Sequence, residues 1–207
     1  MKIAEPDIKQ CVDGDFNKAT EKNEFFGEMY TSWQAGAEIS DTAFESCIFK
    51  GIDFSEIKLD CVDLVDVVFE NCNLSNKKFN KQYLSRVKFI NCRMTGISFI
   101  AATLKDVQFI CCKADYVNFT EANLKAISIS ESNFANMLLF ETKVKNLYLD
   151  KADLYGAEIV STPLSGVDFS KCRLEGIRID EKSLRGIIID KFQAHNLVKM
   201  LGVKIKE

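Results

Sequence analysis

The stretch "YVNFTEANLKAISISESNF", residues 116–134, carries a large apolar residue at every fifth position. These residues are Phe119, Leu124, Ile129 and Phe134. A half-buried strand alternates with a period of two and an amphipathic helix repeats every 3.6 residues, so a period of five fits neither element. The stretch therefore predicts a backbone that is neither a regular helix nor an ordinary strand.

The same five-residue frame continues on both sides of this stretch. It runs without a shift from Ile39 to Ile189, over 31 positions, and Ala114 is the only one that is not large and apolar. Two residues before each of these centres the side chain is usually small or β-branched, as at Cys92 and Ala122. A repeat of this length decides the architecture of the whole chain.

Two segments match the repeat unit of a known family literally. The unit is roughly A-(D/N)-L-x-x, and it appears as "ANL" at 122–124 and "ADL" at 152–154. In these residues the chain resembles the pentapeptide-repeat family. The resemblance implies an all-β solenoid, a right-handed quadrilateral β-helix with one pentapeptide on each side and four pentapeptides in each coil.

A second period, of twenty residues, supports this geometry. Each side would bury one large and one small side chain, while the remaining three residues face water or turn. The frame amounts to nearly eight coils, which at about 4.8 Å per coil make a rod roughly 37 Å long. Two columns show the period: Leu64, Leu84, Leu104, Leu124, Val144, Leu164 and Leu184 in one, and Phe49, Phe69, Phe89 and Phe109 in the other.

Glycines mark the expected corners of the coil. Every glycine inside the frame lies two residues after a centre, and a corner at that place favours a residue without a Cβ. The six glycines are Gly51, Gly96, Gly156, Gly166, Gly176 and Gly186.

The two ends of the chain depart from the frame. We expect an N-terminal cap at 1–38, the repeat β-helix at 39–190 and a C-terminal helix and strand at 191–207. Solenoid ends need a cover, because bare edges would polymerise. In the C-terminal segment, Asp190 and Gln193 predict a short α-helix with an N-cap box, and Gly202 ends it before a strand at 203–205.

The C-terminal segment resembles a narrower group of proteins. The pattern D-x-(F/Y)-Q-A…L…LG after an uninterrupted β-helix is similar to the quinolone-resistance pentapeptide-repeat proteins, the Qnr type, and to their loop-free members from Gram-positive bacteria. This resemblance implies a rod-shaped homodimer, joined through its C-terminal ends, that binds DNA gyrase and topoisomerase IV and protects them from quinolones. The unbroken frame leaves no room for the two projecting loops of many Gram-negative relatives. The expected dimer surface comprises Phe192, Ala194, Leu197, Val198, Leu201, Val203 and Ile205.

Some of these relatives also inhibit the enzyme by imitating duplex DNA, which would require carboxylates in place of phosphates. Residues 1–76 contain 16 acids and 6 bases, whereas residues 77–93 contain six bases and no acid. The alternative is that outward charges only keep the rod soluble. On another edge, Glu121 is expected to pair with Lys125, and the residues twenty positions later repeat this arrangement. The candidate topoisomerase-facing patch is Asp60, Asp63, Asp66 and Glu70.

Composition excludes several other classes of protein. The chain has 207 residues, 47% of them apolar, so it can bury a sizeable core in one or two domains. A formal charge of −3 is too small to mark a polyanion, and the first 30 residues contain neither an apolar run with a basic start nor a membrane span. We expect a cytoplasmic protein with reduced cysteines and with neither a membrane nor a direct nucleic-acid partner.

The sequence offers little for catalysis. The single histidine, His195, falls on the polar side of the predicted helix, and the carboxylates lie on a convex exterior where water is not excluded. The cysteine column that includes Cys72, Cys92 and Cys112 is explained by the packing of small inward side chains. We predict that the protein is not an enzyme and has no cofactor or metal.

Two functional hypotheses follow. The first is a topoisomerase-binding protein of the quinolone-protection type. The second is a pentapeptide-repeat scaffold that has another protein partner and no topoisomerase activity, for which outward apolar residues would be the contact surface. These residues are Ile90, Ile100, Ile110, Phe140 and Val160.

Overall fold

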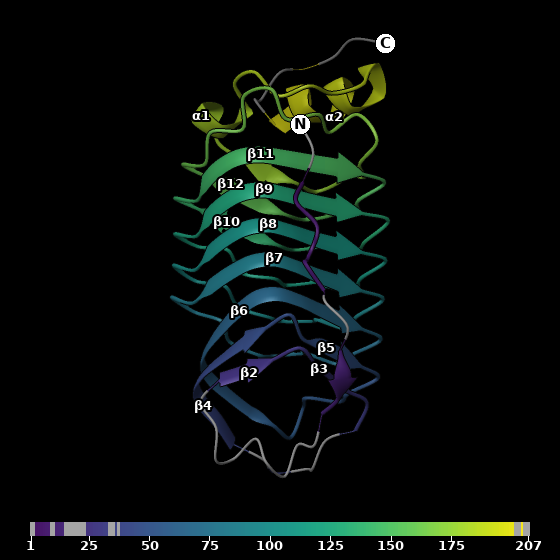
Figure 1. Ribbon diagram of the computed structural model, residues 1–207. Helices are drawn as coiled ribbons and strands as arrows, with labels where there is room; N and C mark the ends of the chain where they lie inside the picture. Colours follow the sequence, from purple (N-terminus) through teal and green to yellow (C-terminus); the bar gives the residue numbers. More distant parts are fainter. Residues whose placement is uncertain are drawn as a thin grey trace.

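The structure is a computed structural model that describes residues 3–8, 11–14, 24–32, 36, 38–200 and 204. The chain forms a four-sided β-solenoid of about eight turns with helices at its C-terminal end (Figure 1). The strands are β1 (Val12–Asp13), β2 (Glu24–Phe26), β3 (Glu28–Tyr30), β4 (Glu38–Glu45), β5 (Ile48–Lys50), β6 (Lys58–Glu70), β7 (Tyr83–Ile90), β8 (Thr103–Ile110), β9 (Asn123–Ser130), β10 (Leu138–Phe140), β11 (Lys143–Asp150), β12 (Glu158–Val160) and β13 (Arg178–Ile179). The helices are α1 (Glu181–Leu184) and α2 (Lys191–Met200).

The strands pair in parallel, and from β4 onwards the register repeats every twenty residues. Leu64 on β6 is aligned with Leu84 on β7, then with Leu104 on β8 and Leu124 on β9. Backbone N–H and C=O groups of successive coils are paired along the rod, which satisfies them without a second sheet. This register confirms the predicted geometry of four pentapeptides in each coil.

The core is a set of stacked columns inside the rod. Most of the predicted centres are buried, and the rest are half-buried. Phe69 lies between Phe49 and Phe89 with ring centroids 5.0 and 5.1 Å apart and nearly parallel planes. Stacked aromatic and aliphatic columns leave the described interior tightly filled, so the chemistry available to a partner is on the outside of the rod.

Left-handed backbone recurs at the corners. All six predicted corner glycines have positive φ, from 66° at Gly156 to 82° at Gly166. Many other residue types adopt the same conformation at equivalent positions, for example Asn71 at φ 57° and Cys111 at φ 54°. Each such residue costs roughly 1–2 kcal/mol in an isolated chain, and the buried centres on both sides hold it in place.

Residues 24–30 form a further layer of the solenoid. β2 pairs with β4 and aligns Phe25 with Phe44, while β3 pairs with β5 and aligns Tyr30 with Phe49. Both ring pairs are stacked, at 4.9 and 5.3 Å between centroids. The alignment joins residues nineteen apart, so a one-residue shift separates this layer from the main frame. The segment predicted as an N-terminal cap therefore contains part of the coil stack.

A helical turn replaces one side of the coil near the C-terminus. Leu184 keeps the five-residue frame, yet it lies in α1, which the spacing alone did not predict. Asp180 caps α1 by accepting the N–H of Ser183 at 3.0 Å, and its other oxygen accepts the N–H of Ser161 at 3.1 Å. Ser183 is buried and accepts the N–H of Thr162 at 2.9 Å. These bonds tie the turn to the coil below.

Candidate interaction surfaces

The four acids of the candidate patch do not form one exposed row. Asp60 lies in β6, but its side chain is outside the described part of the structure. Asp63 is exposed, Asp66 is only 4% exposed, and Glu70 is half-buried and paired with Lys50 at 3.3 Å. Among the acids whose side chains are described, only Asp63 is left as an exposed charge.

Asp66 is withdrawn from solvent by its partners. Arg86, one coil further along the rod, donates Nε and Nη2 to the two carboxylate oxygens at 2.5 and 2.6 Å. The N–H of Asp7 donates to the same carboxylate at 2.8 Å. The hydrogen bonds to Asp66 raise the pKa of Arg86, against a smaller opposing effect of desolvation. A carboxylate neutralised in this way presents no charge to a partner, so the predicted role of Asp66 in the patch is corrected.

The N–H of Asp7 belongs to an extended segment, residues 3–8, which we call the N-terminal strap. The strap runs along the rod axis across β6, β7 and β8 (Figure 1). Glu5 forms an ion pair with Lys88. No periodicity marks the strap in the sequence, so its position was not predicted. Its hydrogen bonds join Ala4 N–H to Asp106 at 3.1 Å, Glu5 to Gln108 at 3.2 Å, and the N–H and C=O groups of Asp7 to Asp66 and Ser46 at 2.8 and 2.9 Å.

An acidic groove surrounds Asp63 near the N-terminal end of the rod. The groove has a volume of about 550 Å³, and Glu24 and Asp41 line it with Asp63. Lys81 is on the same rim. The sequence did not indicate Glu24, because that residue precedes the shift in frame. The groove is the place where exposed carboxylates from three layers of the solenoid gather.

Ion pairs on the rod follow its axis. Glu131 pairs with Lys151 at 2.7 Å and Asp153 pairs with Arg173 at 3.1 Å, in both cases twenty residues apart. The predicted pairing of Glu121 with Lys125 is wrong, as no such ion pair occurs within the described ranges, and the equivalent residues in the next coil also fail to pair. The third pair at this spacing, Glu181 with Arg185, does form at 2.6 Å, because these residues lie on the helical turn of α1. Stacking places side chains twenty residues apart side by side, at about 4.8 Å, whereas four residues along the chain lead around a corner.

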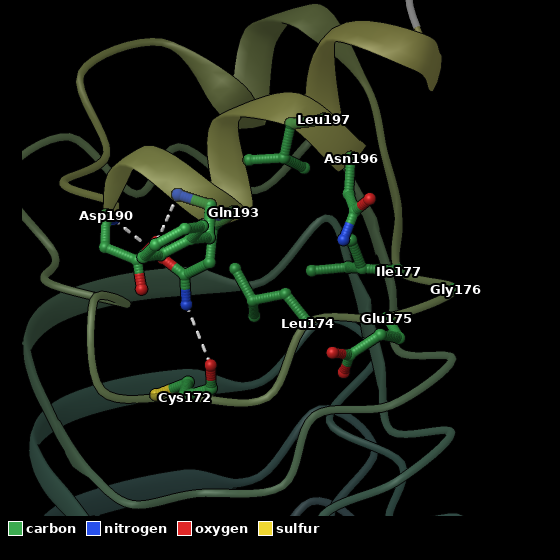
Figure 2. A pocket seen from close by; sticks show the side chains of 10 residues that line it. Cys172, Leu174, Glu175, Gly176, Ile177, Asp190, Gln193, Asn196 and Leu197 are labelled. Carbon is green, nitrogen blue, oxygen red and sulfur yellow. Dashed lines mark hydrogen bonds between the residues drawn. The ribbon is translucent and has the colours of Figure 1, made fainter.

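Helix α2 closes the C-terminal end of the rod. Asp190 accepts the N–H of Gln193 at 2.9 Å, and the Gln193 side chain accepts the N–H of Asp190 at 2.9 Å, so the predicted capping box is present. The amide of Gln193 also donates to the carbonyl of Cys172 (Figure 2) and to that of Phe169, at 2.8 Å each. One buried side chain therefore both starts the helix and fastens it to the last coil.

A groove of about 440 Å³ separates α2 from the last coil. Figure 2 shows Leu197 above Leu174 and Ile177 on the inner side of this groove. Leu197 is 5% exposed and belongs to the core, whereas Phe192 is 73% exposed. Of the other predicted dimer residues, Ala194 and Val198 are half-buried, and Leu201, Val203 and Ile205 lie outside the described residues.

The cysteines occupy two environments. Cys92 and Cys112 point inward and donate their thiols to carbonyl oxygens of neighbouring coils, for example Cys112 to Phe89 at 3.3 Å. Burial raises the pKa of Cys47 and of Cys172 to about 11, so these thiols stay protonated at neutral pH. All eight cysteines are free, and the part of the chain that is described contains no group of three His, Cys, Asp or Glu able to hold a metal.

No helix among the described residues is long and apolar enough to cross a membrane. Comparison with models of protein families found two matches. Residues 62–139 match a pentapeptide repeat region, and residues 37–76 match eight copies of the pentapeptide repeat. Comparison with curated protein sequences found no significant match.

Several solved structures are similar to this chain at low sequence identity. A structure of QnrB1, a plasmid-mediated fluoroquinolone resistance protein, is 19% identical over 88% of this chain and 97% of its own, with a TM-score of 0.43. A pentapeptide repeat protein from the Arabidopsis thaliana thylakoid lumen is 21% identical over 62% of this chain and 75% of its own, with a TM-score of 0.38. HetL of the cyanobacterium Nostoc, involved in regulation of heterocyst differentiation, is 16% identical over 81% and 90%, with a TM-score of 0.32.

Proposed function

Because the chain is a pentapeptide-repeat protein, we propose that it acts without catalysis, by binding DNA gyrase or topoisomerase IV and modulating the response of the enzyme to quinolones. The observation that carries this proposal is the C-terminal end of the rod. The segment that resembles the Qnr type in sequence forms the capping box of Asp190 and Gln193 and docks on the last coil. The residues that carry the resemblance in sequence therefore form an ordered helix start in this chain.

The same end supports a homodimer. Phe192 in α2 and Ile188 just before this helix are exposed by 73% and 50% where the rod ends. Exposed large apolar residues at a solenoid end are expected to be covered by another surface. A two-fold contact there would place the two rods end to end, with the acidic grooves at the far ends. Leu197 is buried beneath this surface, so it would not contact the second protomer.

The enzyme-facing surface in this proposal is the acidic groove. Asp63 is retained from the predicted patch, joined by Glu24 and Asp41, while Asp66 is excluded by its pairing with Arg86. Exposed carboxylates attract a basic DNA-binding surface over roughly 10 Å at 0.1 M salt. Binding through this groove should therefore weaken as ionic strength rises.

The alternative function is a scaffold for a different protein partner. It is favoured by the outward apolar column in which Ile90 on β7 is aligned with Ile110 on β8. Both residues are half-buried, as are Ile100, Phe140 and Val160. A contact made through this column would be insensitive to salt, which separates the two functions.

A supercoiling assay decides between them. DNA gyrase would be assayed with and without ciprofloxacin over graded concentrations of the protein. We expect supercoiling to be restored in the presence of the drug and inhibited without it at high protein concentrations. Asp41→Asn with Asp63→Asn should lose both effects. The matched control is Glu121→Gln with Glu141→Gln, which removes two exposed charges elsewhere on the rod. Absence of any effect of the wild-type protein would favour the scaffold.

A further inference from the structure

The N-terminal strap fits the repeat of the rod. Ala4 and Asp7 donate their N–H groups to Asp106 and Asp66, which occupy the same corner column two coils apart. Three residues of extended chain span about 10 Å, and two coils rise by about 9.6 Å. Two N–H groups three residues apart in an extended peptide therefore meet these two corner carboxylates.

The strap also places an acidic side chain between these two anchors. Lys88 and Gln108 are aligned on β7 and β8, so both reach the carboxylate of Glu5. The next residue, Pro6, has a fixed φ that favours extended backbone and lowers the entropy lost on docking. The ligand that fits these residues is therefore an extended peptide that carries a carboxylate. A phosphodiester lacks the N–H donors that Asp66 and Asp106 accept, and the carboxylate of Asp106 would repel it.

The strap can leave without opening the core. Each of its side chains is at least partly exposed, and the groups on the rod that bond to Ala4, Glu5 and Asp7 are polar side chains. When the strap is absent, Asp66 keeps its two hydrogen bonds from Arg86. Segments held by a few exposed polar contacts open at low free-energy cost.

We propose that the corner surface formed by Asp66, Asp106, Lys88 and Gln108 is a peptide-binding site. Residues 3–8 occupy it within the same chain, and an extended segment of a partner protein that carries a carboxylate replaces them. The inference is independent of topoisomerase binding, since it concerns a different surface from the acidic groove at Asp63.

The test uses the full chain and a fluorescent peptide of the strap sequence, IAEPDI. Glu5→Lys places a cation against Lys88 and should release the strap, which faster hydrogen exchange at the N–H groups of Ala4 and Asp7 would report. The apparent affinity for a ligand scales with the fraction of open sites, so the peptide should bind this variant roughly tenfold more tightly than wild type. Glu5→Ala serves as a milder second variant.

A reversal experiment adds Lys88→Glu to Glu5→Lys. This double variant should restore slow exchange at Ala4 and Asp7 and should no longer bind the peptide, whose carboxylate would be repelled. A control peptide with lysine in place of the glutamate should not bind Glu5→Lys. The proposal is overturned if the strap opens and the peptide binds no better than to wild type, if neither substitution of Glu5 changes exchange, or if a single-stranded oligonucleotide binds as well as the peptide.

Discussion

At the scale of single residues, the corner position decides how much strain each coil stores. Gly51 has φ 70°, and a Cβ built there would have open space around it. Gly51→Ala should therefore report the backbone conformation alone and lower the free energy of unfolding by about 1 kcal/mol. Urea denaturation measures this loss.

The matched control for this substitution is Gly51→Asn. Asparagine tolerates left-handed backbone better than alanine does, and Asn71 and Asn91 already occupy corner positions with positive φ. The asparagine variant should therefore be more stable than the alanine variant. Equal losses in the two variants would show that something other than backbone conformation is responsible.

Thiol accessibility is a second prediction at this scale. Cys61 and Cys111 are exposed, while Cys112, next in sequence to Cys111, is buried. A thiol reagent at pH 8 should modify the two exposed cysteines rapidly and the inward ones only after unfolding in guanidinium. Rapid modification of Cys92 in the folded protein would contradict the structure of the cysteine column.

The same burial gives a pH dependence. The pKa of Cys47 and Cys172 rises to about 11 in the folded protein, whereas the unfolded chain ionises these thiols near about 8.5. Below about pH 8.5 the two thiols should not affect the free energy of unfolding. This free energy should fall as the pH rises toward 11, because the unfolded state then binds fewer protons than the folded state. Replacing both cysteines by alanine should flatten this alkaline decline.

At the scale of elements, α2 depends on Gln193. This side chain is 9% exposed and donates to two buried carbonyls. Gln193→Ala removes the donor to the Cys172 carbonyl, whereas the Phe169 carbonyl still accepts the N–H of Cys172 at 2.8 Å, so stability should fall by about 1–3 kcal/mol. Hydrogen exchange in α2 and urea unfolding would measure the effect. Asn196→Ala, at an exposed position on the same helix, should change stability by less than about 0.5 kcal/mol, and a similar loss in both variants would contradict the proposed anchor.

The five-residue spacing predicts those segments whose position is determined by side chains that point into the core. The sequence predicts Phe89 and Leu104 in the core because both are centres of the five-residue frame and both recur at a period of twenty. Phe25 and Tyr30 obey the same rule, but a one-residue shift hides them. Leu184 is in the five-residue frame but lies in a helical turn. The turn forms there because the side chain of Asp180 accepts the N–H of Ser183 and caps the helix.

Surface features were harder to predict, because the frame carries no information about which outward groups meet. The pairing of Glu121 with Lys125 failed for this reason. Asp66 was taken as an exposed charge, although its partners Arg86 and Asp7 are 20 and 59 residues away in sequence. The strap could not be inferred at all, since its contacts are polar and lie across coils. The capping box at Asp190 was predictable because its two residues are close in sequence.

At the scale of the whole molecule, two substitutions at the C-terminal end are expected to have different effects, one on dimer assembly and the other on stability. Phe192 is exposed, so Phe192→Asp should split the proposed homodimer and leave the circular dichroism spectrum unchanged. Leu197 is buried against the last coil, and burying such a side chain is worth roughly 1.5–3 kcal/mol. Leu197→Asp should therefore unfold the C-terminal end. Sedimentation and circular dichroism distinguish the two outcomes, and a wild-type monomer at tens of micromolar would contradict the dimer.

The twenty-residue register also affects the sequence in which the segments of the chain fold. Coil contacts join residues about twenty apart however long the rod is, which gives a relative contact order near 0.1, in the range of fast-folding helical bundles. Folding can begin at any coil and spread to its neighbours. The strap is the exception, because Ala4 and Asp106 are 102 residues apart. During synthesis, which proceeds from the N-terminus, residues 3–8 leave the ribosome before any of the coils they cross, so the part of this structure made first is among the last to be ordered.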